Sequence, residues 1–182
     1  MRWEWRTFGD GLGAAEGRLR ALAPERLQES DETYLVAAEG HDAVKARDGL
    51  MDIKHLEQVD DDGLELWRPV MKSPLPISPA DASAVLAALS VDAPPLELDA
   101  YDVADLARAS AAVTLVPVHK SRRHYTFHGC MAELTDLRTA GGTTPTIAVE
   151  SEDATRVLAA VRELGLDSRP NVSVPRALAA RL

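Results

Sequence analysis

The sequence has little cysteine and no long apolar run. Cys130 is the only cysteine in 182 residues, so no disulfide can form within the chain. A reducing compartment suits such a chain best. No apolar run is long enough to span a bilayer, and residues 1–10 lack the apolar core of a signal peptide. We therefore expect a cytoplasmic protein that has no membrane partner.

The sequence also lacks an excess of positive charge. Its formal net charge is −9 and its pI is about 5.0, which argues against non-specific binding of nucleic acid. A local basic site remains compatible with these values. The length and the 46% hydrophobic content suffice for a sizeable core. We expect a single domain spanning residues 1–182.

Lysine is scarce, and its positions are informative. The chain has only four lysines against 16 arginines, namely Lys45, Lys54, Lys72 and Lys120. All four lie in predicted strands or at strand ends, and none lies on a predicted helix. Exposed lysines usually collect on helices, so the lysines here mark the sheet.

Alternation of polar and apolar residues predicts many short antiparallel strands. The order is five strands, two helices, three strands and one helix. The predicted strands are 2–8, 32–40, 42–49, 50–59, 64–72 and three more between 112 and 151. Asp48-Gly49 predicts a hairpin turn. Residues 13–30 are helical or irregular. Strands so close in sequence favour a closed or nearly closed sheet.

The remaining helices follow from cap signals. Ser78 and Pro79 begin one helix, residues 98–111 form a second, and Ser151 caps the last, which ends near Gly165.

Charged residues share one face of several predicted strands. Arg2, Glu4 and Arg6 alternate with Trp3 and Trp5, and the same period joins Lys45 to Arg47 and Lys120 to Arg122. In one interpretation this is the solvent face of an antiparallel sheet. In the other, the sheet closes and the charges line its interior. Unpaired buried charges are costly, so such a lining would need glutamate partners and a polyanionic ligand such as a phosphate chain.

The ordered set of charged strands resembles the CYTH domain, or triphosphate tunnel metalloenzyme, superfamily. That family has a first strand of the form E-x-E-x-K, a basic pair on a middle strand, a K-x-R strand and a closing E-x-E strand. The corresponding segments here are "RWEWR" (2–6), "VKAR" (44–47), "KSR" (120–122) and "IAVE" (147–150). Two positions depart from the pattern, because Arg2 and Ala148 stand where the family has glutamates.

The resemblance implies an α+β fold, an eight-stranded antiparallel β-tunnel with helices packed outside. It also implies roles for particular residues. The substrate-binding cations would be Arg2, Arg6, Lys45, Arg47, Lys54, Lys72, Lys120 and Arg122. Glu4 and Glu150 would hold one Mg²⁺ or Mn²⁺ ion, since two family carboxylates are missing. Glu133 or Glu65 would orient or deprotonate the attacking water.

The function implied is metal-dependent hydrolysis of a phosphoanhydride. Polyphosphate, inorganic triphosphate or a nucleoside triphosphate would be the substrate. The alternative is a non-catalytic module that binds polyphosphate or a nucleotide, which the lost carboxylates favour. A third interpretation is a structural β-barrel that binds no ligand. We expect Trp3, Trp5 and Trp67 to pack outside the tunnel, and His124 and His128 to lie too far apart to share a zinc ion.

Overall fold

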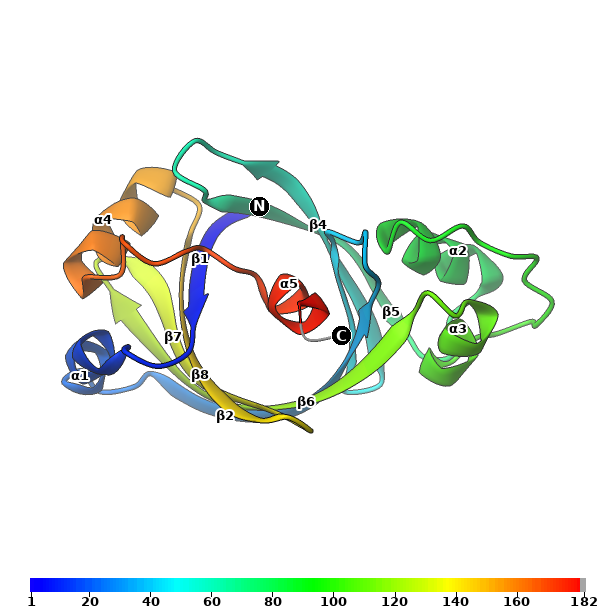
Figure 1. Ribbon diagram of the computed structural model, residues 1–182, viewed down its shortest axis with the longest axis horizontal. Coiled ribbons are helices and arrows are strands. Elements are labelled where there is room, and N and C mark those ends of the chain that lie inside the picture. The colour runs from blue at the N-terminus through cyan, green and yellow to red at the C-terminus, as the bar shows by residue number, and fades with distance from the viewer. Residues whose placement is uncertain (181–182) are drawn as a thin grey trace. The chain divides into compact units, whose positions relative to one another are not determined.

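The computed structural model describes residues 1–180 and consists of strands flanked by short helices (Figure 1). The strands are β1 (Arg2–Phe8), β2 (Arg26–Val36), β3 (Ala43–Arg47), β4 (Leu50–Val59), β5 (Glu65–Pro74), β6 (Thr114–Phe127), β7 (Cys130–Thr139) and β8 (Gly142–Ser151). The helices are α1 (Gly13–Arg20), α2 (Pro79–Ala88), α3 (Val103–Ala109), α4 (Ala154–Leu164) and α5 (Val174–Ala179). No helix within residues 1–180 combines the length and apolarity needed to cross a membrane.

The eight strands form a closed sheet in the order β1-β5-β4-β3-β2-β6-β7-β8. The pairings β1–β8, β3–β4, β6–β7 and β7–β8 are all antiparallel. The β3–β4 hairpin turns at Asp48 and Gly49, which both have positive φ, of 52° and 72°. Two consecutive positive-φ residues match the right-handed twist of the flanking strands. The expected α+β fold with an eight-stranded antiparallel barrel is thereby confirmed.

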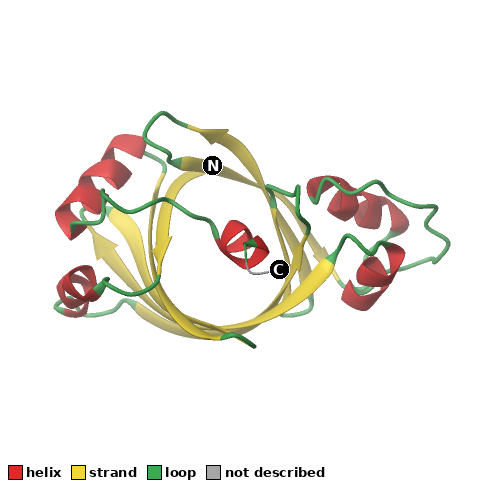
Figure 2. Ribbon diagram, viewed as in Figure 1, coloured by secondary structure: helices red, strands yellow, loops and turns green. Residues whose placement is uncertain are grey.

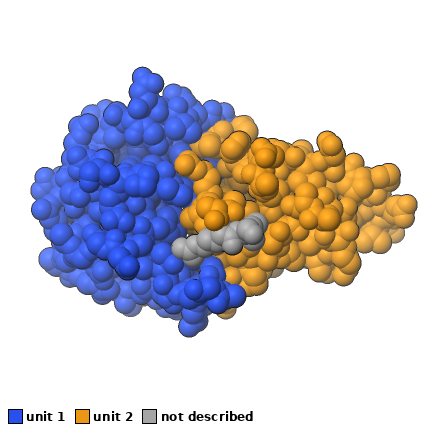
Figure 3. Space-filling model, viewed as in Figure 1, with its two compact units in different colours: residues 1–30, 57–67, 119–173 blue, residues 31–56, 68–118, 174–182 orange. Residues whose placement is uncertain are grey.

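The chain divides into two compact units, coloured separately in Figure 3. Unit 1 comprises residues 1–30, 57–67 and 119–173. Its apolar core lies between the sheet and the helices α1 and α4, with α4 packed against β1, β7 and β8. Trp5, Ala132 and Val149 contribute from the strands, and Leu19 and Val161 from the helices. The face of β1 that carries Trp3 and Trp5 is therefore the outer face of the barrel wall, as expected.

Unit 2 comprises residues 31–56, 68–118 and 174–182. A second apolar cluster joins its strands to α2 and α3, which lie side by side in Figure 2. Val44 and Ile53 face Val85, Leu86 and other apolar residues of the two helices. The short helix α5 packs against β3. The helices α2 and α3 thus cover the outer face of the sheet in this unit. The buried residues of α5 belong to neither apolar cluster, and α5 lies on the side of these strands away from α2 and α3 (Figure 1).

Several element boundaries differ from the sequence-based expectation. β2 begins at Arg26 rather than at residue 32, and α3 covers only Val103–Ala109. Ser78 caps α2 as predicted, but the side chain of Asp153, not Ser151, caps α4. Asp153 accepts hydrogen bonds from the backbone N–H groups of Thr155 and Arg156, whereas Ser151 accepts one from Asp153 itself. Several cap-forming residues in succession make the choice of cap ambiguous from sequence.

Candidate functional site

The register of unit 1 assigns each side chain to one face of the sheet. Glu4 lies directly opposite Glu65 on β5 and Glu150 on β8, and Glu133 lies opposite Ala148. Directly opposite residues point to the same side of a sheet. Because the other side packs under α1 and α4, these residues lie on the inner face of unit 1. We use that term for the face that carries Arg2, Glu4, Arg6, Glu65, Trp67, Lys120, Arg122, Glu133 and Glu150.

Three cations on this inner face are buried. Arg6 is 6% exposed, Lys120 3% and Arg122 5%. Such values exclude the interpretation in which the charged face of these strands is the solvent face. Each of these three cations therefore needs charged or polar partners within the protein, because an unpaired buried charge is costly.

The ion pair between Arg6 and Glu133 is central to this group of buried charges. Both terminal nitrogens of Arg6 lie 3.2 Å from Glu133 Oε1, and Arg6 Nε donates to Glu4 Oε1 at 2.9 Å. Glu133 Oε1 also accepts from the Thr135 hydroxyl at 2.7 Å, and Glu133 Oε2 lies 3.5 Å from Arg122 Nε. Arg122 in turn donates to Ser30 Oγ at 2.5 Å. One carboxylate therefore holds two guanidinium groups in fixed positions.

These contacts shift the pKa values of both partners. Burial alone raises the pKa of Glu133, but the charges of Arg6, Arg122 and Lys120 outweigh it and lower that pKa to about 2. Burial likewise opposes the charge on Arg6, yet Glu133 and Glu4 raise its pKa above the usual value. Burial and the nearby cations Arg26 and Arg122 lower the pKa of His124 despite the attraction of Glu133. The Glu133–Arg6 pair stays ionised at neutral pH.

A row of carboxylates runs beside these cations. Glu65, Glu4 and Glu150 occupy directly opposite positions on the neighbouring strands β5, β1 and β8. Within residues 1–180, no three His, Cys, Asp or Glu side chains gather closely enough to hold a metal ion by themselves. Mg²⁺ needs only one or two carboxylates when phosphate and water oxygens complete its shell. The donor set fits a single hard cation completed by a phosphate chain, and it does not fit a site made by protein alone.

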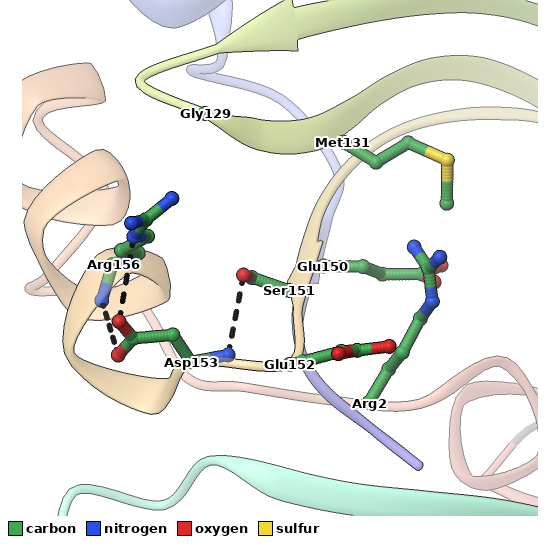
Figure 4. Close-up of a pocket in the computed structure, with 8 residues that line it drawn as sticks. All are labelled: Arg2, Gly129, Met131, Glu150, Ser151, Glu152, Asp153 and Arg156. Atoms are coloured by element: carbon green, nitrogen blue, oxygen red, sulfur yellow. Dashed lines mark hydrogen bonds and ion pairs between the residues drawn. The ribbon is translucent and has the colours of Figure 1, made fainter.

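A pocket opens where this row ends (Figure 4). It has a volume of about 390 Å³, and Arg2, Met131 and Glu150 contribute side chains to it from β1, β7 and β8. Figure 4 labels both Arg2 and Glu150 among the side chains that line it. Asp153 and Arg156, an ion pair at 3.4 Å, form its rim. Two of the sequence-predicted site residues thus border a space that can admit a ligand.

Unit 2 has a separate charged cluster. Lys45 Nζ and Arg47 Nη1 lie 3.2 and 3.4 Å from the two oxygens of Glu32, whose side chain is fully buried. Burial, assisted by the charges of Arg47 and Lys54, lowers the pKa of Lys45 although Glu32 opposes the shift. The sequence analysis identified both cations but not Glu32, which lies in a strand that carries no lysine or arginine beyond Arg26.

Three other predicted cations have a different setting. Arg2 and Lys72 are exposed, and Lys54 is half-buried. Among residues 1–180, none of these three side chains makes a hydrogen bond or an ion pair within the protein. Their charges are therefore available to a ligand, in contrast to those of Arg6, Lys45 and Arg47.

Asn171 is a site-forming residue that the sequence analysis missed. Its side-chain oxygen accepts from the backbone N–H of Arg6 at 2.7 Å, and its side-chain nitrogen donates to the carbonyls of Glu4 and Gly63 at 3.2 and 2.8 Å. Val172 N–H donates to the carbonyl of Arg6 at 2.8 Å. This tail segment continues the hydrogen bonding of β1 beyond its pairing with β5, and so fixes the backbone that carries Glu4 and Arg6.

The expectation that Trp67 packs outside the tunnel is wrong. Trp67 lies directly opposite Arg2, two residues from Glu65, and so belongs to the inner face of unit 1. Trp3 and Trp5 pack on the outer apolar cluster, but Trp67 belongs to neither apolar cluster. The spacing of two residues from Glu65 was the sequence signal that separates Trp67 from Trp3 and Trp5.

Comparisons by sequence find no relative: no family model matches the chain, and neither does any curated protein. Comparison of structures does find relatives. A putative adenylyl cyclase from Hippeastrum, described as having a dominant triphosphatase activity, is 12% identical, with a TM-score of 0.53 over 91% of this chain and 89% of that chain.

Two further proteins have the same architecture. A conserved hypothetical protein from Pyrococcus furiosus is 17% identical, with a TM-score of 0.54 over the whole of both chains. A putative adenylate cyclase from Bacillus halodurans is 13% identical, with a TM-score of 0.50 over 94% of this chain and 91% of that chain. At such identities the likeness shows the fold alone. The closed eight-stranded sheet and these structural relatives confirm the resemblance noted in the sequence: the chain has the CYTH, or triphosphate tunnel, fold.

Proposed function

We propose that this protein hydrolyses a phosphoanhydride bond of a triphosphate or polyphosphate chain with the help of one divalent metal ion. One observation carries the proposal. The inner face of unit 1 sets a row of carboxylates, Glu65, Glu4 and Glu150, beside the buried cations Arg6, Lys120 and Arg122. Phosphoryl transfer needs both types of group close together, because its transition state spreads negative charge over several oxygens.

The cations would bind the phosphoryl oxygens. Arg6 and Arg122 are both held by Glu133, so neither has to reorganise when a substrate arrives. Donors fixed in advance in a water-poor site stabilise developing charge more strongly than mobile ones. Arg2, which borders the pocket of Figure 4 and has no ion pair within residues 1–180, would bind the part of the phosphate chain nearest to that pocket.

The carboxylates would have three separate roles. Glu4 and Glu150 would hold one Mg²⁺ or Mn²⁺ ion, whose chemistry is to neutralise charge on phosphoryl oxygens. Glu133, with its pKa near 2, is too weak a base to deprotonate water at neutral pH, so its role would be to orient Arg6 and Arg122. Glu65, which is 1% exposed, would orient the attacking water.

The lysine and arginine cluster of unit 2 would also bind phosphate. Lys45 is partly neutralised by Glu32, while Lys54 and Lys72 have no ion pair among the described residues. Arg47 lies 3.6 Å from Asp48 as well as near Glu32. We assign these four cations to substrate binding only, because the carboxylates that contact Lys45 and Arg47, Glu32 and Asp48, are engaged in ion pairs with them.

A second candidate function is binding of polyphosphate or a nucleotide without turnover. The observation that favours it is the state of Glu4 and Glu133, whose carboxylates are both engaged by Arg6. Arg2 and Ala148 add to this, because they remove two carboxylates that the family pattern contains. In such a module the same cations would hold the chain, and no metal would be required.

The two functions are separated by measuring orthophosphate release from tripolyphosphate and from ATP, with Mg²⁺, with Mn²⁺ and with EDTA. Hydrolysis predicts release that EDTA abolishes. Glu4→Gln and Glu150→Gln should each lower kcat/KM on the order of 100-fold, because a metal ion contributes several kcal/mol to the transition state. Glu163→Gln, an exposed position on α4, is the matched control and should have no effect.

Absence of release with either metal, together with binding of tripolyphosphate in calorimetry, would replace hydrolysis by the binding function. Absence of both release and binding would leave a barrel with no phosphate ligand.

A further inference from the structure

Trp67 has a polar group that nothing in the protein satisfies. Its side chain is 4% exposed, and among residues 1–180 its indole Nε1 is buried and has no hydrogen-bond partner. Buried tryptophan N–H groups usually find an acceptor. Leaving a buried donor unpaired costs about 1–3 kcal/mol, and each such group in a native protein calls for an explanation.

Trp67 is buried among the core residues, but it lies outside the two apolar clusters. Those clusters contain Trp5 and, at their margin, Trp3. A phenylalanine would supply apolar area at the same position without a buried donor. The feature that distinguishes tryptophan here is therefore its N–H group.

The position of Trp67 beside Arg2 indicates the role of its indole N–H group. It lies directly opposite Arg2, so that their Cβ atoms are about 5 Å apart, and about 7 Å along β5 from Glu65. Arg2 borders the pocket of about 390 Å³ in Figure 4 and makes no ion pair within the described part of the chain. An unpaired cation and an unpaired neutral donor thus lie side by side on the face that carries the carboxylate row.

We propose that Trp67 is a substrate-binding residue whose indole N–H donates a hydrogen bond to a phosphoryl oxygen of the bound chain, next to Arg2. The inference rests on the proposed function, since it needs an oxygen-rich anion on the inner face of unit 1. It adds a contact that the charged-residue pattern of the sequence does not contain. It also accounts for the unpaired N–H of Trp67, because the ligand supplies an acceptor that the described part of the protein does not.

The test compares Trp67→Phe with Trp5→Phe. Trp67→Phe removes the donor and keeps a ring, so it should weaken tripolyphosphate binding at least tenfold in calorimetry. A hydrogen bond to a charged acceptor is lost, and tenfold corresponds to about 1.4 kcal/mol. The melting temperature of the ligand-free variant should stay unchanged or rise, because the unpaired donor is gone. Trp5→Phe, on the outer apolar cluster, should lower the melting temperature and leave the affinity unchanged.

A second measurement does not depend on the folding of Trp67→Phe. The ¹H–¹⁵N spectrum of the wild-type chain contains three indole signals, since the sequence has three tryptophans. Trp3→Phe and Trp5→Phe assign two of them and leave the third to Trp67. Addition of tripolyphosphate in EDTA, which prevents metal-dependent turnover, should move the Trp67 signal downfield and leave the other two in place.

The outcomes separate this inference from the proposed function. If the wild-type chain binds tripolyphosphate while the Trp67 signal stays fixed, or while Trp67→Phe binds equally well, the role of Trp67 is overturned. The proposed function is unaffected by that result, because orthophosphate release decides it. If the wild-type chain binds neither tripolyphosphate nor ATP, both are overturned together.

Discussion

Glu133 is the residue on which the buried charges of unit 1 depend. Its two oxygens contact Arg6, Arg122 and Thr135, and it lies 4.0 Å from His124. Removing one partner of a buried ion pair is more harmful than never having had the pair, because a charge is then left without compensation. A single carboxylate on β7 therefore sets the positions of two cations that come from β1 and β6.

We predict that Glu133→Gln lowers the free energy of unfolding by about 3–5 kcal/mol at neutral pH. The folded pKa near 2 lies below the ordinary value of 4.5, so the stabilising effect is complete above pH 4.5. It is lost as the pH falls toward 2, where wild-type Glu133 becomes protonated and resembles glutamine. Urea denaturation of both proteins between pH 2.5 and 7 should show a difference that shrinks over this window. A difference independent of pH would contradict the ionised role.

At the scale of elements, the tail between α4 and α5 completes β1. Asn171 satisfies the N–H of Arg6 and the carbonyls of Glu4 and Gly63. We predict that Asn171→Ala lowers the free energy of unfolding by about 2–3 kcal/mol, because backbone groups of β1 lose their partners. The same variant should bind tripolyphosphate more weakly, since Glu4 and Arg6 are carried by that backbone. Denaturation and calorimetry test both effects.

A suitable control for this variant is Arg169→Ala in the same tail. Arg169 donates to the carbonyl of Phe8, at the end of β1, and to that of Asp10, just beyond it. Its loss should therefore affect stability with little effect on binding. Equal losses of binding in the two variants would contradict a specific role for Asn171.

Elements with a strong period could be predicted from the sequence, and those that depend on distant partners could not. The alternation of "RWEWRTF" and the Asp48-Gly49 turn identified β1 and the β3–β4 hairpin, because both signals are local. The start of β2 was missed because "RLQES" lacks clear alternation. Trp67 was assigned to the wrong face although it stands two residues from Glu65, a spacing that places both side chains on one face of a strand.

The same distinction between local signals and distant contacts applies to the residues of the candidate site. Its charged members were identifiable because lysine and arginine in a strand are conspicuous in an acidic chain. Asn171 and Glu32 were not, because an amide in an irregular tail and a glutamate in the polar run "ESDET" carry no periodic signal. Their roles depend on contacts between segments far apart in the sequence.

At the scale of the whole molecule, a net charge of −9 coexists with cations that lack protein partners. Each unit has its own charged cluster, around Glu133 in unit 1 and around Glu32 in unit 2. In both, one carboxylate contacts two cations, and Glu4 and Asp48 are further partners of Arg6 and Arg47. That residues 1–182 form a single domain stays a prediction. The melting temperature of the full chain with a bound anion tests the chain as a whole.

We predict that tripolyphosphate raises the melting temperature of the full chain in EDTA. A ligand at 100 times its Kd stabilises the folded state by about 2.7 kcal/mol, which corresponds to a rise of roughly 5–10 °C for a chain of this size. Sodium chloride at equal ionic strength is the control, because general screening acts on exposed charges throughout an acidic protein. A multivalent phosphate chain should exceed both this salt and orthophosphate, since its oxygens can meet several fixed cations at once. Equal shifts with sodium chloride would contradict specific binding and leave the unpaired cations without a phosphate ligand.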